Sequence, residues 1–405
     1  MEVTLIGMGP GDPSNLTSSA LAALERADVL IGSRRLVEGC ALSPEAKRFS
    51  STKSAEIVEI LASSPWECPC VLYSGDTGFH SGTRTLLPLL EERGIRWRVL
   101  PGVSSMQYFA AQLGRPWQEW QVVSAHGLAC DPVGEVLAAH GRPVFFLTGG
   151  AGGAAALCRR LAQAGLGSLP AAVGEALSYP EERIVEAQVW ELAEQEFSTL
   201  SVLLVDGAAP VWPVRSQGID DGAFLRGEVP MTKQEVRAAA LAKLEVRDGA
   251  VYWDVGAGTG SVSVELALLA PRSPVYAVEY KGEACALIRA NRERFGAYNL
   301  VLAEGRAPAA LADLPAPDGV FIGGSEGELI PILEAALSRN PAVRFCVTAI
   351  AVETLGVAVA AFTQLGMSPQ ITQITVARSR RAGERNLMLG QNPVWIITGQ
   401  KEALL

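Results

Sequence analysis

Short apolar stretches alternate with helical stretches along most of the chain, and several of them end in loops that contain glycine. This order of strand, loop, helix and strand is typical of α/β domains built on open sheets. In the first half, strands are expected at residues 3–6, 29–32, 70–74, 97–100, 121–124, 144–147, 171–173 and 200–205. Because ligands of such sheets bind beyond the carboxyl ends of strands, the loops at 7–13, 74–79 and 101–105 predict one site at a shared edge.

The second half alternates more strictly between strands and helices. Its strands are expected at residues 250–255, 275–278, 300–303, 319–322, 344–348, 371–376 and 394–398. We therefore predict a doubly wound sheet that ends in an added β-hairpin.

Between the halves, residues 206–230 lose this periodicity and are rich in proline, glycine and acidic residues, which predicts a linker. A helix should start just after it, because Thr232 and Glu235 have the spacing of a capping box. A chain of 405 residues exceeds one ordinary domain. The expected divisions are 1–205 (lobes of about 1–114 and 115–205), the linker at 206–230, and 231–405.

The strongest local motif is DVGAGTG at residues 254–260. Asp254 is the next-to-last residue of an expected strand, and Gly256, Gly258 and Gly260 follow at alternate positions before a helix starts. Glycine lets a ligand touch the backbone and permits turn conformations that a Cβ atom forbids. Glu279 ends the next expected strand, where an acid can bind both hydroxyls of a ribose.

Two cofactors present a ribose at such a turn. NAD also presents a pyrophosphate, which prefers a GxGxxG spacing and a helix N-terminus. S-adenosylmethionine (SAM) presents an ammonium group and a sulfonium instead. Because Asp254 would repel a pyrophosphate and attract an ammonium group, the motif favours SAM. A tight turn without a ligand explains one of the three glycines well and the others poorly.

The glycine loop at residues 7–11 (GMGPG) resembles that turn, but Pro10 and Pro13 would prevent a helix from starting there. Taken alone, it indicates a structural turn as readily as a ligand site. The loop at 101–105 adds two hydroxyl groups, Ser104 and Ser105, at an expected helix start.

Charge and cysteine content argue against several classes of function. The net charge of −9 argues against general nucleic-acid binding, because no overall positive field is present. The seven cysteines and three histidines form no zinc or disulfide framework, so we expect no metal, reduced thiols and a cytoplasmic protein. We expect no signal peptide and no membrane partner, because no basic region precedes the first apolar run and no apolar run could span a bilayer.

Four motifs of the first half resemble the tetrapyrrole (corrin/porphyrin) methyltransferases, most of all the C5-methylating enzymes of cobalamin synthesis. They are GMGPGDPxxLT at 7–17, SGDTGF at 74–79, PGVSSMQY at 101–108 and GExxSYPEER at 174–183. In the second half, MTKQEVR at 231–237, the glycine turn and FIGGS at 321–325 are similar to the C15-methylating, decarboxylating enzymes. The fused order resembles the precorrin-6Y C5,15-methyltransferase (decarboxylating) family over nearly the whole chain.

The resemblance implies two methyltransferases of unrelated fold in one chain, each with its own SAM. A two-lobed tetrapyrrole methylase fold with SAM in the cleft between its lobes would precede a Rossmann-like class I SAM methyltransferase fold. The cofactor-binding residues that it implies in the first domain are Pro10, Gly75, Asp76, Ser104 and Ser105, with Leu147 and Thr148 from the second lobe. Thr77 stands where the family usually has proline, so we expect a less rigid turn. The families also suggest a homo-oligomer.

The implied substrate is an anionic tetrapyrrole, whose carboxylates arginine can bind in bidentate fashion. The candidate substrate-binding residues are Arg183, Arg237, Arg378, Arg380, Arg381 and Arg385. On charge alone, a solvated loop explains the last four equally well. His126 and Glu353 are catalytic candidates, and a structural role is open for each. Few histidines and no paired nucleophile and base suggest that catalysis depends on positioning.

Two other functions remain open on the residues alone. The glycine turn and Glu279 also suit an NAD-dependent oxidoreductase. The second possible function is a tetrapyrrole-binding protein in which one half of the chain has lost activity. Thr77 is the feature that suggests it.

Overall fold

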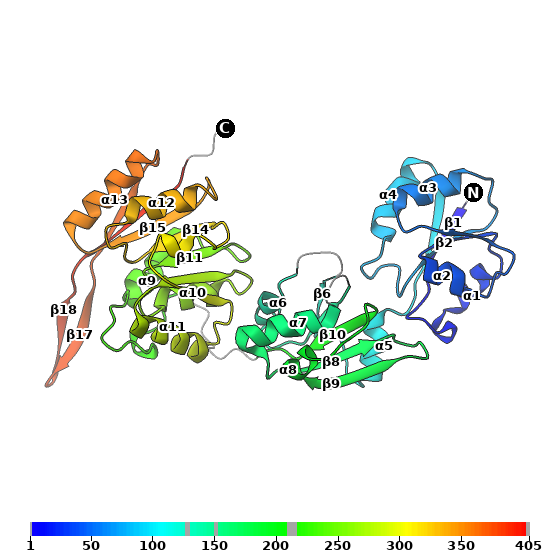
Figure 1. The fold of residues 1–405 in the computed structure, drawn as a ribbon, viewed down its shortest axis with the longest axis horizontal. Helices are drawn as coiled ribbons and strands as arrows, with labels where there is room; N and C mark the ends of the chain where they lie inside the picture. The colour runs from blue at the N-terminus through cyan, green and yellow to red at the C-terminus, as the bar shows by residue number, and fades with distance from the viewer. Residues whose placement is uncertain (1, 126–129, 150–152, 209–216, 402–405) are drawn as a thin grey trace. The chain divides into compact units, whose positions relative to one another are not determined.

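The computed structural model describes residues 2–125, 130–149, 153–208 and 217–401 of the chain. It divides into two compact units (Figure 1). The first unit comprises residues 1–130, 142–163 and 167–206, and the second comprises 131–141, 164–166 and 207–405. Within the described residues, no helix has both the length and the apolar character needed to cross a bilayer.

The first unit contains two five-stranded sheets. The first sheet is parallel throughout, in the order β3-β2-β4-β1-β5. Its strands are β1 (Glu2–Gly7), β2 (Val29–Gly32), β3 (Lys47–Ser50), β4 (Pro69–Tyr73) and β5 (Arg96–Leu100). Between them lie η1 (Pro13–Asn15), α1 (Ser18–Leu24), α2 (Arg34–Gly39), α3 (Ser54–Ala62) and α4 (Thr83–Glu92). Leu5 packs into one apolar cluster and Ile6 into another, so both faces of the sheet are covered.

The second sheet is mixed, in the order β6-β7-β10-β8-β9, with β6 and β7 parallel. Its strands are β6 (Gln121–Ser124), β7 (Val144–Leu147), β8 (Pro170–Glu175), β9 (Arg183–Gln188) and β10 (Ser201–Val205). The accompanying helices are α5 (Ser105–Gln112), α6 (Pro132–Ala138), α7 (Gly153–Leu161), the π-helical η2 (Ala162–Leu166) and α8 (Val189–Ala193). Helix α5 packs here, because Met106 and Phe109 share a buried cluster with Phe145.

The second unit is built on a seven-stranded sheet of order β13-β12-β11-β14-β15-β19-β16, in which β19 runs antiparallel to both neighbours. The strands are β11 (Tyr252–Val255), β12 (Val275–Glu279), β13 (Leu300–Glu304), β14 (Gly319–Ile322), β15 (Arg344–Ala349), β16 (Gln370–Ile374) and β19 (Val394–Gly399). The helices are η3 (Asp221–Ala223), α9 (Gln234–Leu244), α10 (Ser261–Leu269), α11 (Gly282–Phe295), η4 (Ala309–Leu311), α12 (Leu329–Leu337) and α13 (Val352–Gln364). A separate hairpin of β17 (Ala377–Ala382) and β18 (Arg385–Gly390) projects from this unit (Figure 1).

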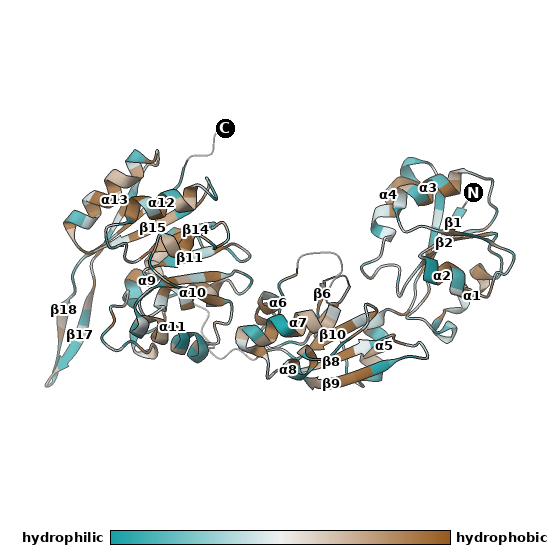
Figure 2. Ribbon diagram, viewed as in Figure 1, coloured by the Kyte–Doolittle hydropathy of each residue, from teal (hydrophilic) through white to brown (hydrophobic). Residues whose placement is uncertain are grey.

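Hydrophobic residues, brown in Figure 2, lie in strands and in the helices that cover them. In the second unit, Trp253 and Phe321 are buried on opposite faces of the sheet, in two separate clusters. Burying a large side chain of this kind contributes about 1.5–3 kcal/mol. These two clusters therefore hold the carboxyl edge of the sheet in place from both sides.

Every strand expected from the sequence is present within a few residues, and β3, β9, β17 and β18 were not expected. The predicted capping box is wrong, because the N-cap of α9 is Lys233 and makes no side-chain cap. Residues 217–230, expected within the linker, pack into the second unit through Ile219 and Phe224. Both side chains are apolar and buried, whereas a solvated linker would expose them.

Candidate functional site

The glycine turn after β11 lies where the strand order of the seven-stranded sheet reverses, between β11 and β14. Gly256 has a φ of +71°, and a Cβ atom there would stand 2.5 Å from the carbonyl oxygen of Gly324 in the loop after β14. Gly258 and Gly260 also have positive φ angles, of +56° and +74°. A side chain at these positions would be strained, so the turn brings bare backbone to the crevice where ligands of such sheets bind.

Two polar groups in this turn are buried without a partner among the described residues. Asp254 is fully buried; its Oδ2 accepts a short hydrogen bond from Ser263, and its Oδ1 has no hydrogen bond. The hydroxyl of Thr259 is likewise buried and unpartnered. Burial raises the pKa of Asp254 to about 7, and the Ser263 hydrogen bond opposes this shift. Buried polar groups are normally satisfied, so both atoms suit a bound polar ligand.

Glu279 is brought to the same turn. Its Oε2 accepts a hydrogen bond from the N–H of Gly258 at 3.0 Å. Its Oε1 accepts from the N–H groups of Tyr280 at 2.8 Å and Lys281 at 3.0 Å. These bonds fix the carboxylate next to the glycine backbone, which is the placement expected for an acid that binds ribose hydroxyls.

Glu326 joins three loops at this edge and was not singled out from the sequence. It accepts a hydrogen bond from the hydroxyl of Tyr280 at 2.6 Å and pairs with Arg306 at 3.1 Å and Lys281 at 3.7 Å. The Tyr280 hydrogen bond, with help from the two cations, lowers the pKa of Glu326. Tyr280 and Lys281 follow β12, Arg306 follows β13 and Glu326 follows β14. These contacts therefore cross-link the three loops beside Glu279.

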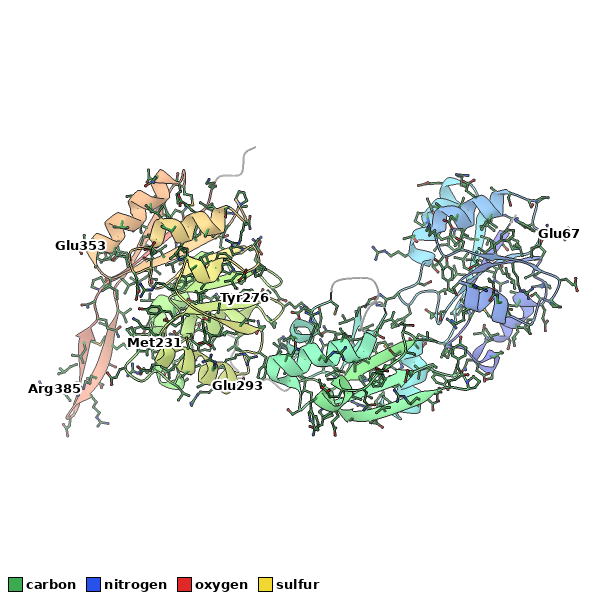
Figure 3. The ribbon with its side chains drawn as sticks, viewed as in Figure 1. Glu67, Met231, Tyr276, Glu293, Glu353 and Arg385 are labelled. Carbon is green, nitrogen blue, oxygen red and sulfur yellow. The ribbon has the colours of Figure 1, made fainter. Side chains whose placement is uncertain are left out.

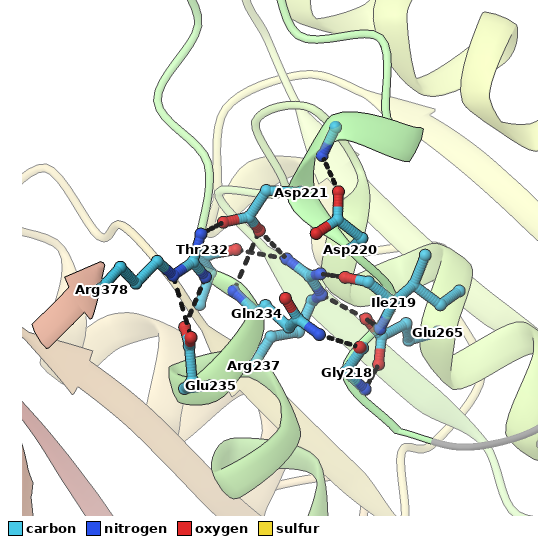
Figure 4. A network of polar contacts seen from close by, with 11 residues as sticks. Gly218, Ile219, Asp220, Asp221, Thr232, Gln234, Glu235, Arg237, Glu265 and Arg378 are labelled. Atoms are coloured by element: carbon cyan, nitrogen blue, oxygen red, sulfur yellow. Dashed lines mark hydrogen bonds and ion pairs between the residues drawn. The ribbon is translucent and has the colours of Figure 1, made fainter. Parts of the chain in front are cut away.

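Arg237 lies inside the second unit and is completely buried (Figure 4). Its guanidinium contacts the carboxylates of Glu265 and Asp221, the carbonyls of Thr232 and Ile219, and the ring of Phe224. Glu265 in turn accepts the N–H groups of residues 218 and 219. The network ties the segment before α9 to α10, so a substrate carboxylate would have to displace an internal acid to reach Arg237.

Arg378 stands at the base of the hairpin and binds Glu235 in bidentate fashion and Asp221 at 3.0 Å (Figure 4). These partners, the Glu235 hydrogen bond first, raise its pKa. Arg380 and Arg385 share a face of the hairpin with Arg378, because strand side chains alternate, and Arg381 points to the other face. All three are exposed, and Figure 3 labels Arg385 near the tip.

The three loops of the first unit meet at the carboxyl edge of the parallel sheet. Gly9 and Gly75 form an isolated antiparallel bridge, with N···O distances of 3.1 and 2.8 Å. A Cβ atom on Gly102 would stand 2.6 Å from the carbonyl oxygen of Gly7. The loops after β1, β4 and β5 are therefore in direct backbone contact, as the shared-edge expectation requires.

Several polar side chains predicted to bind a cofactor hold these loops together. The Asp76 carboxylate accepts from the N–H groups of Gly78 at 2.8 Å and Gly102 at 3.0 Å, which joins the second loop to the third. Ser104 is the N-cap of α5, in a capping box with Gln107. These groups are occupied by the protein backbone, so they orient the loops.

The remaining first-unit candidates are close to these loops. Pro10 is buried beside the Gly9–Gly75 bridge, and Ser105 is the first residue of α5. Leu147, at the end of β7, belongs to the same apolar cluster as Phe79 of the second loop. Thr148 hydrogen-bonds to Ser201. Thr77 is buried, and its hydroxyl donates a long hydrogen bond of 3.4 Å to the carbonyl of Leu100.

Three candidates remain. Arg183 pairs with Glu175 at 2.7 Å and lies over the ring of Phe197. Glu353 is exposed in the first turn of α13 (Figure 3), so of the two roles left open for it, the structural one as a buried, paired carboxylate does not fit. His126 lies outside the described residues. Among the residues that the structure does describe, no cluster of three or more His, Cys, Asp or Glu could hold a metal ion.

Residues 2–193 match the family described as tetrapyrrole (corrin/porphyrin) methylases, and residues 223–401 match the family described as the precorrin methyltransferase domain. Over 405 residues, 98% of this chain and 95% of the relative, the chain is 33% identical to precorrin-6Y C(5,15)-methyltransferase [decarboxylating] from Sinorhizobium sp. The chain belongs to the precorrin-6Y C5,15-methyltransferase family. This confirms the family predicted from the motifs.

Two further relatives each match about half of the chain. A probable cobalt-precorrin-6B C(15)-methyltransferase (decarboxylating) from Pyrobaculum calidifontis is 48% identical over 190 residues, 46% of this chain and 97% of the relative. A crystal structure of precorrin-6Y C5,15-methyltransferase from Geobacter metallireducens GS-15 is 39% identical, covers 45% of this chain and 97% of that chain, and has a TM-score of 0.44. The Sinorhizobium and Pyrobaculum relatives are methyltransferases by name, so they do not support the NAD-dependent or non-catalytic alternatives.

Membership of the precorrin-6Y C5,15-methyltransferase family also confirms the predicted folds, since a two-sheet tetrapyrrole methylase unit precedes a Rossmann-like methyltransferase unit. The family is SAM-dependent. The residues of the second unit fit SAM, because Asp254 and Thr259 offer unpartnered buried oxygens beside a glycine turn that a Cβ atom would obstruct. In the first unit, the polar side chains of the loops are directed to the backbone.

Proposed function

We propose that this chain is a bifunctional SAM-dependent enzyme of cobalamin biosynthesis. It methylates a precorrin at C5 and C15 and decarboxylates the acetate side chain of ring C. The observation that carries this proposal is the match to a C5,15-methyltransferase along 98% of the chain, which includes both units. We place the enzyme in the cytoplasm, which the absence of a disulfide among its seven described cysteines supports.

We assign the C5 reaction to residues 1–205 and the C15 reaction with decarboxylation to residues 231–405. Residues 206–230 link the two, and residues 217–230 of this linker pack with the second unit. Support comes from the order of the two family matches, at 2–193 and 223–401.

We infer one SAM for each unit. When bound, SAM supplies an electrophilic methyl group. In the second unit, Asp254 attracts the ammonium group of SAM and Thr259 hydrogen-bonds to the cofactor. Glu279 accepts hydrogen bonds from the ribose hydroxyls. In the first unit, Pro10, Gly75, Ser105 and Leu147 bring backbone and apolar surface to the cofactor, while Asp76, Ser104 and Thr148 hold the loops that carry them.

The chemistry that remains for the protein is positioning. Methyl transfer requires the nucleophilic ring carbon at about 3–3.5 Å from the methyl group, in line with the leaving sulfur. Decarboxylation releases CO₂ and leaves an electron pair that a conjugated ring imine of the tetrapyrrole accepts. Neither step needs a protein nucleophile, which agrees with two sites built from glycine backbone and carboxylates.

The hairpin serves either substrate binding or self-association, and we propose the second as its main role. Arg378, Arg380 and Arg385 share one face with Leu387 and Leu389, and both leucines are exposed by 47–52%. Met388, on the other face, is 65% exposed. An isolated two-stranded hairpin is marginally stable in water, so a second copy of the chain packed on these apolar side chains would stabilise it. Arg380, Arg381 and Arg385 remain candidates for contact with substrate carboxylates.

The product mass after incubation of the full chain with SAM and precorrin-6Y tests the proposal. We expect two added methyl groups and the loss of one CO₂. The Asp254→Ala variant should give a product with the C5 methyl group alone, because the first unit keeps its own site. A wild-type product with a single methyl group, obtained when both units bind cofactor, would contradict the bifunctional assignment.

A further inference from the structure

Arg35 lies at the edge of the first-unit site and was not singled out from the sequence. It follows the carboxyl end of β2, which is the neighbour of β4 in the parallel sheet. Its Nη2 donates a hydrogen bond to Ser74 Oγ at 3.1 Å. Because Ser74 directly precedes Gly75, this contact places the guanidinium beside the second glycine loop.

Tyr179 holds the other side of this arginine. The Arg35 guanidinium carbon lies 5.4 Å from the centre of the Tyr179 ring, which is within the range of a cation–π contact. The same ring packs against Gly11 of the first loop, where a Cβ atom would stand 2.6 Å from Tyr179 Cζ. Arg35 is therefore located between the first and second loops by two independent contacts.

The segment that carries Tyr179 is held in an unusual backbone conformation. Ala176 and Ser178 have φ angles of +45° and +64°, in a region that such residues rarely adopt. Ser178 Oγ accepts a hydrogen bond from the N–H of Asp12 at 2.8 Å, and Tyr179 N–H donates to the carbonyl of Ala176 at 2.9 Å. Non-glycine residues in this region cluster at ligand-binding sites, where surrounding contacts maintain the strain.

Arg35 has no carboxylate partner within the described parts of the chain. The adjacent Arg34 pairs with Glu38 at 2.8 Å, while Arg35 makes only the Ser74 and Tyr179 contacts. The nearby acids are engaged elsewhere: Asp12 caps η1 through the N–H of Ser14, and Asp76 binds two loop N–H groups. A cation that is held by a hydroxyl and a ring, with donors left over, is suited to an external anion.

We propose that Arg35, oriented by Tyr179 and Ser74, binds a carboxylate of the ligands of the first unit. This inference rests on the proposed C5 methyltransfer and adds a specificity residue to it. Two carboxylates could be bound, one on a side chain of the tetrapyrrole and one on the methionine part of SAM. Arg35 is an exposed residue that follows β2, whose loop is not one of the three glycine loops, so the tetrapyrrole carboxylate is the favoured partner.

The test compares Arg35→Gln with Arg34→Gln in the full chain. Arg34 is the matched control, because it is adjacent, more than three-quarters exposed and paired with Glu38. The C5 reaction is followed by product mass with precorrin-6Y, and cofactor affinity by calorimetry with adenosylhomocysteine. Gly258→Val is added to both variants and to the otherwise wild-type chain, which is the reference. This substitution blocks cofactor binding in the second unit, so calorimetry measures binding to the first unit alone.

For Arg35→Gln we expect the KM for precorrin-6Y to rise about tenfold or more, with kcat and adenosylhomocysteine affinity unchanged, and Arg35→Lys to recover part of the loss. A loss of adenosylhomocysteine affinity instead would assign the anchor to the cofactor carboxylate. Equal behaviour of Arg35→Gln and Arg34→Gln in both measurements would overturn the proposal. The proposed function is tested separately. It would be refuted if the reference enzyme bound precorrin-6Y, as seen by visible absorption, but added no C5 methyl group. The effect of Arg35→Gln on precorrin-6Y binding could still be measured in that case.

Discussion

We expect Asp254 to make cofactor binding in the second unit depend on pH. Burial raises the pKa of its carboxyl group to about 7, and only the ionised carboxylate attracts an ammonium group. Affinity for adenosylhomocysteine should therefore be about tenfold weaker at pH 6 than at pH 8. Calorimetric titration of the full chain at the two pH values measures this difference.

The Asp254→Asn variant is the matched control, because it keeps the size of the side chain and removes its charge. It should bind weakly at both pH values. In the ligand-free wild type, burial raises the pKa of Asp254 from its ordinary value of 3.8 to about 7, so between these pH values the folded state holds the proton more tightly than the unfolded state. The free energy of unfolding therefore falls as pH rises through this window, and the variant should show a shallower fall. An unchanged pH profile of affinity in Asp254→Asn would rule this carboxylate out as its source.

Arg237 should matter for stability more than for substrate binding. Replacing it with methionine leaves Glu265 buried without its cation, which costs about 3–5 kcal/mol. Urea unfolding followed by circular dichroism should show the loss in the second unit. In the fraction that remains folded, the KM for the tetrapyrrole should stay within about twofold of the wild-type value. The reason is that the buried guanidinium of Arg237 has no access to the substrate. A large rise in KM without loss of stability would restore Arg237 as a substrate contact.

Residues within one motif could be predicted from the sequence, whereas residues paired across the fold could not. Asp254, the three glycines and Glu279 follow from a strand–turn–helix spacing, which is a local property of the backbone. The burial of Arg237 depends on Glu265 and Asp221, which are distant in sequence. Arg35 was missed although it follows the carboxyl end of a parallel strand, the same rule that located the three glycine loops.

At the scale of elements, the hairpin of β17 and β18 is the part of the second unit that its own core does not explain. Every residue of β18 is exposed, including three large apolar side chains. Changing Leu387 and Leu389 to aspartate should lower the assembly mass measured by light scattering while the thermal unfolding of the seven-stranded sheet is retained. The matched pair Arg380→Gln and Arg385→Gln should leave the mass unchanged. If only the arginine changes affect the enzyme, through a higher KM, the hairpin is a substrate element.

The hairpin also shows why some elements escaped prediction. The basic run at 378–385 has high polarity, and a solvated loop was an equally good explanation of its charge. Cross-strand pairing from residues 377–390 and the bidentate contact of Arg378 with Glu235 supply the order that the pattern does not reveal. The same contact explains the failed capping box, because Glu235 is bound by arginine and does not return to the backbone before α9.

At the scale of the whole molecule, the two units have separate sheets, separate cores and separate glycine turns, so each reaction should survive the loss of the other. Gly102→Val would force a side chain against the carbonyl of Gly7, where a Cβ atom alone would stand at 2.6 Å. Gly258→Val would strain a residue with a φ of +56° and press on the carbonyl of Pro230. The first variant should lose C5 methylation alone, and the second should lose C15 methylation and CO₂ release.

Mixing the two variants carries this argument further. Each mixture contains one intact unit of each kind, on different chains. One possibility is that the intermediate is released into solution after one unit has acted on it. The mixture should then form the doubly methylated, decarboxylated product, at a rate that rises with the concentration of Gly258→Val. Product mass as a function of protein concentration measures this. A mixture that accumulates singly methylated products, while each variant keeps its remaining activity, would show instead that the intermediate passes between the two units of a single chain.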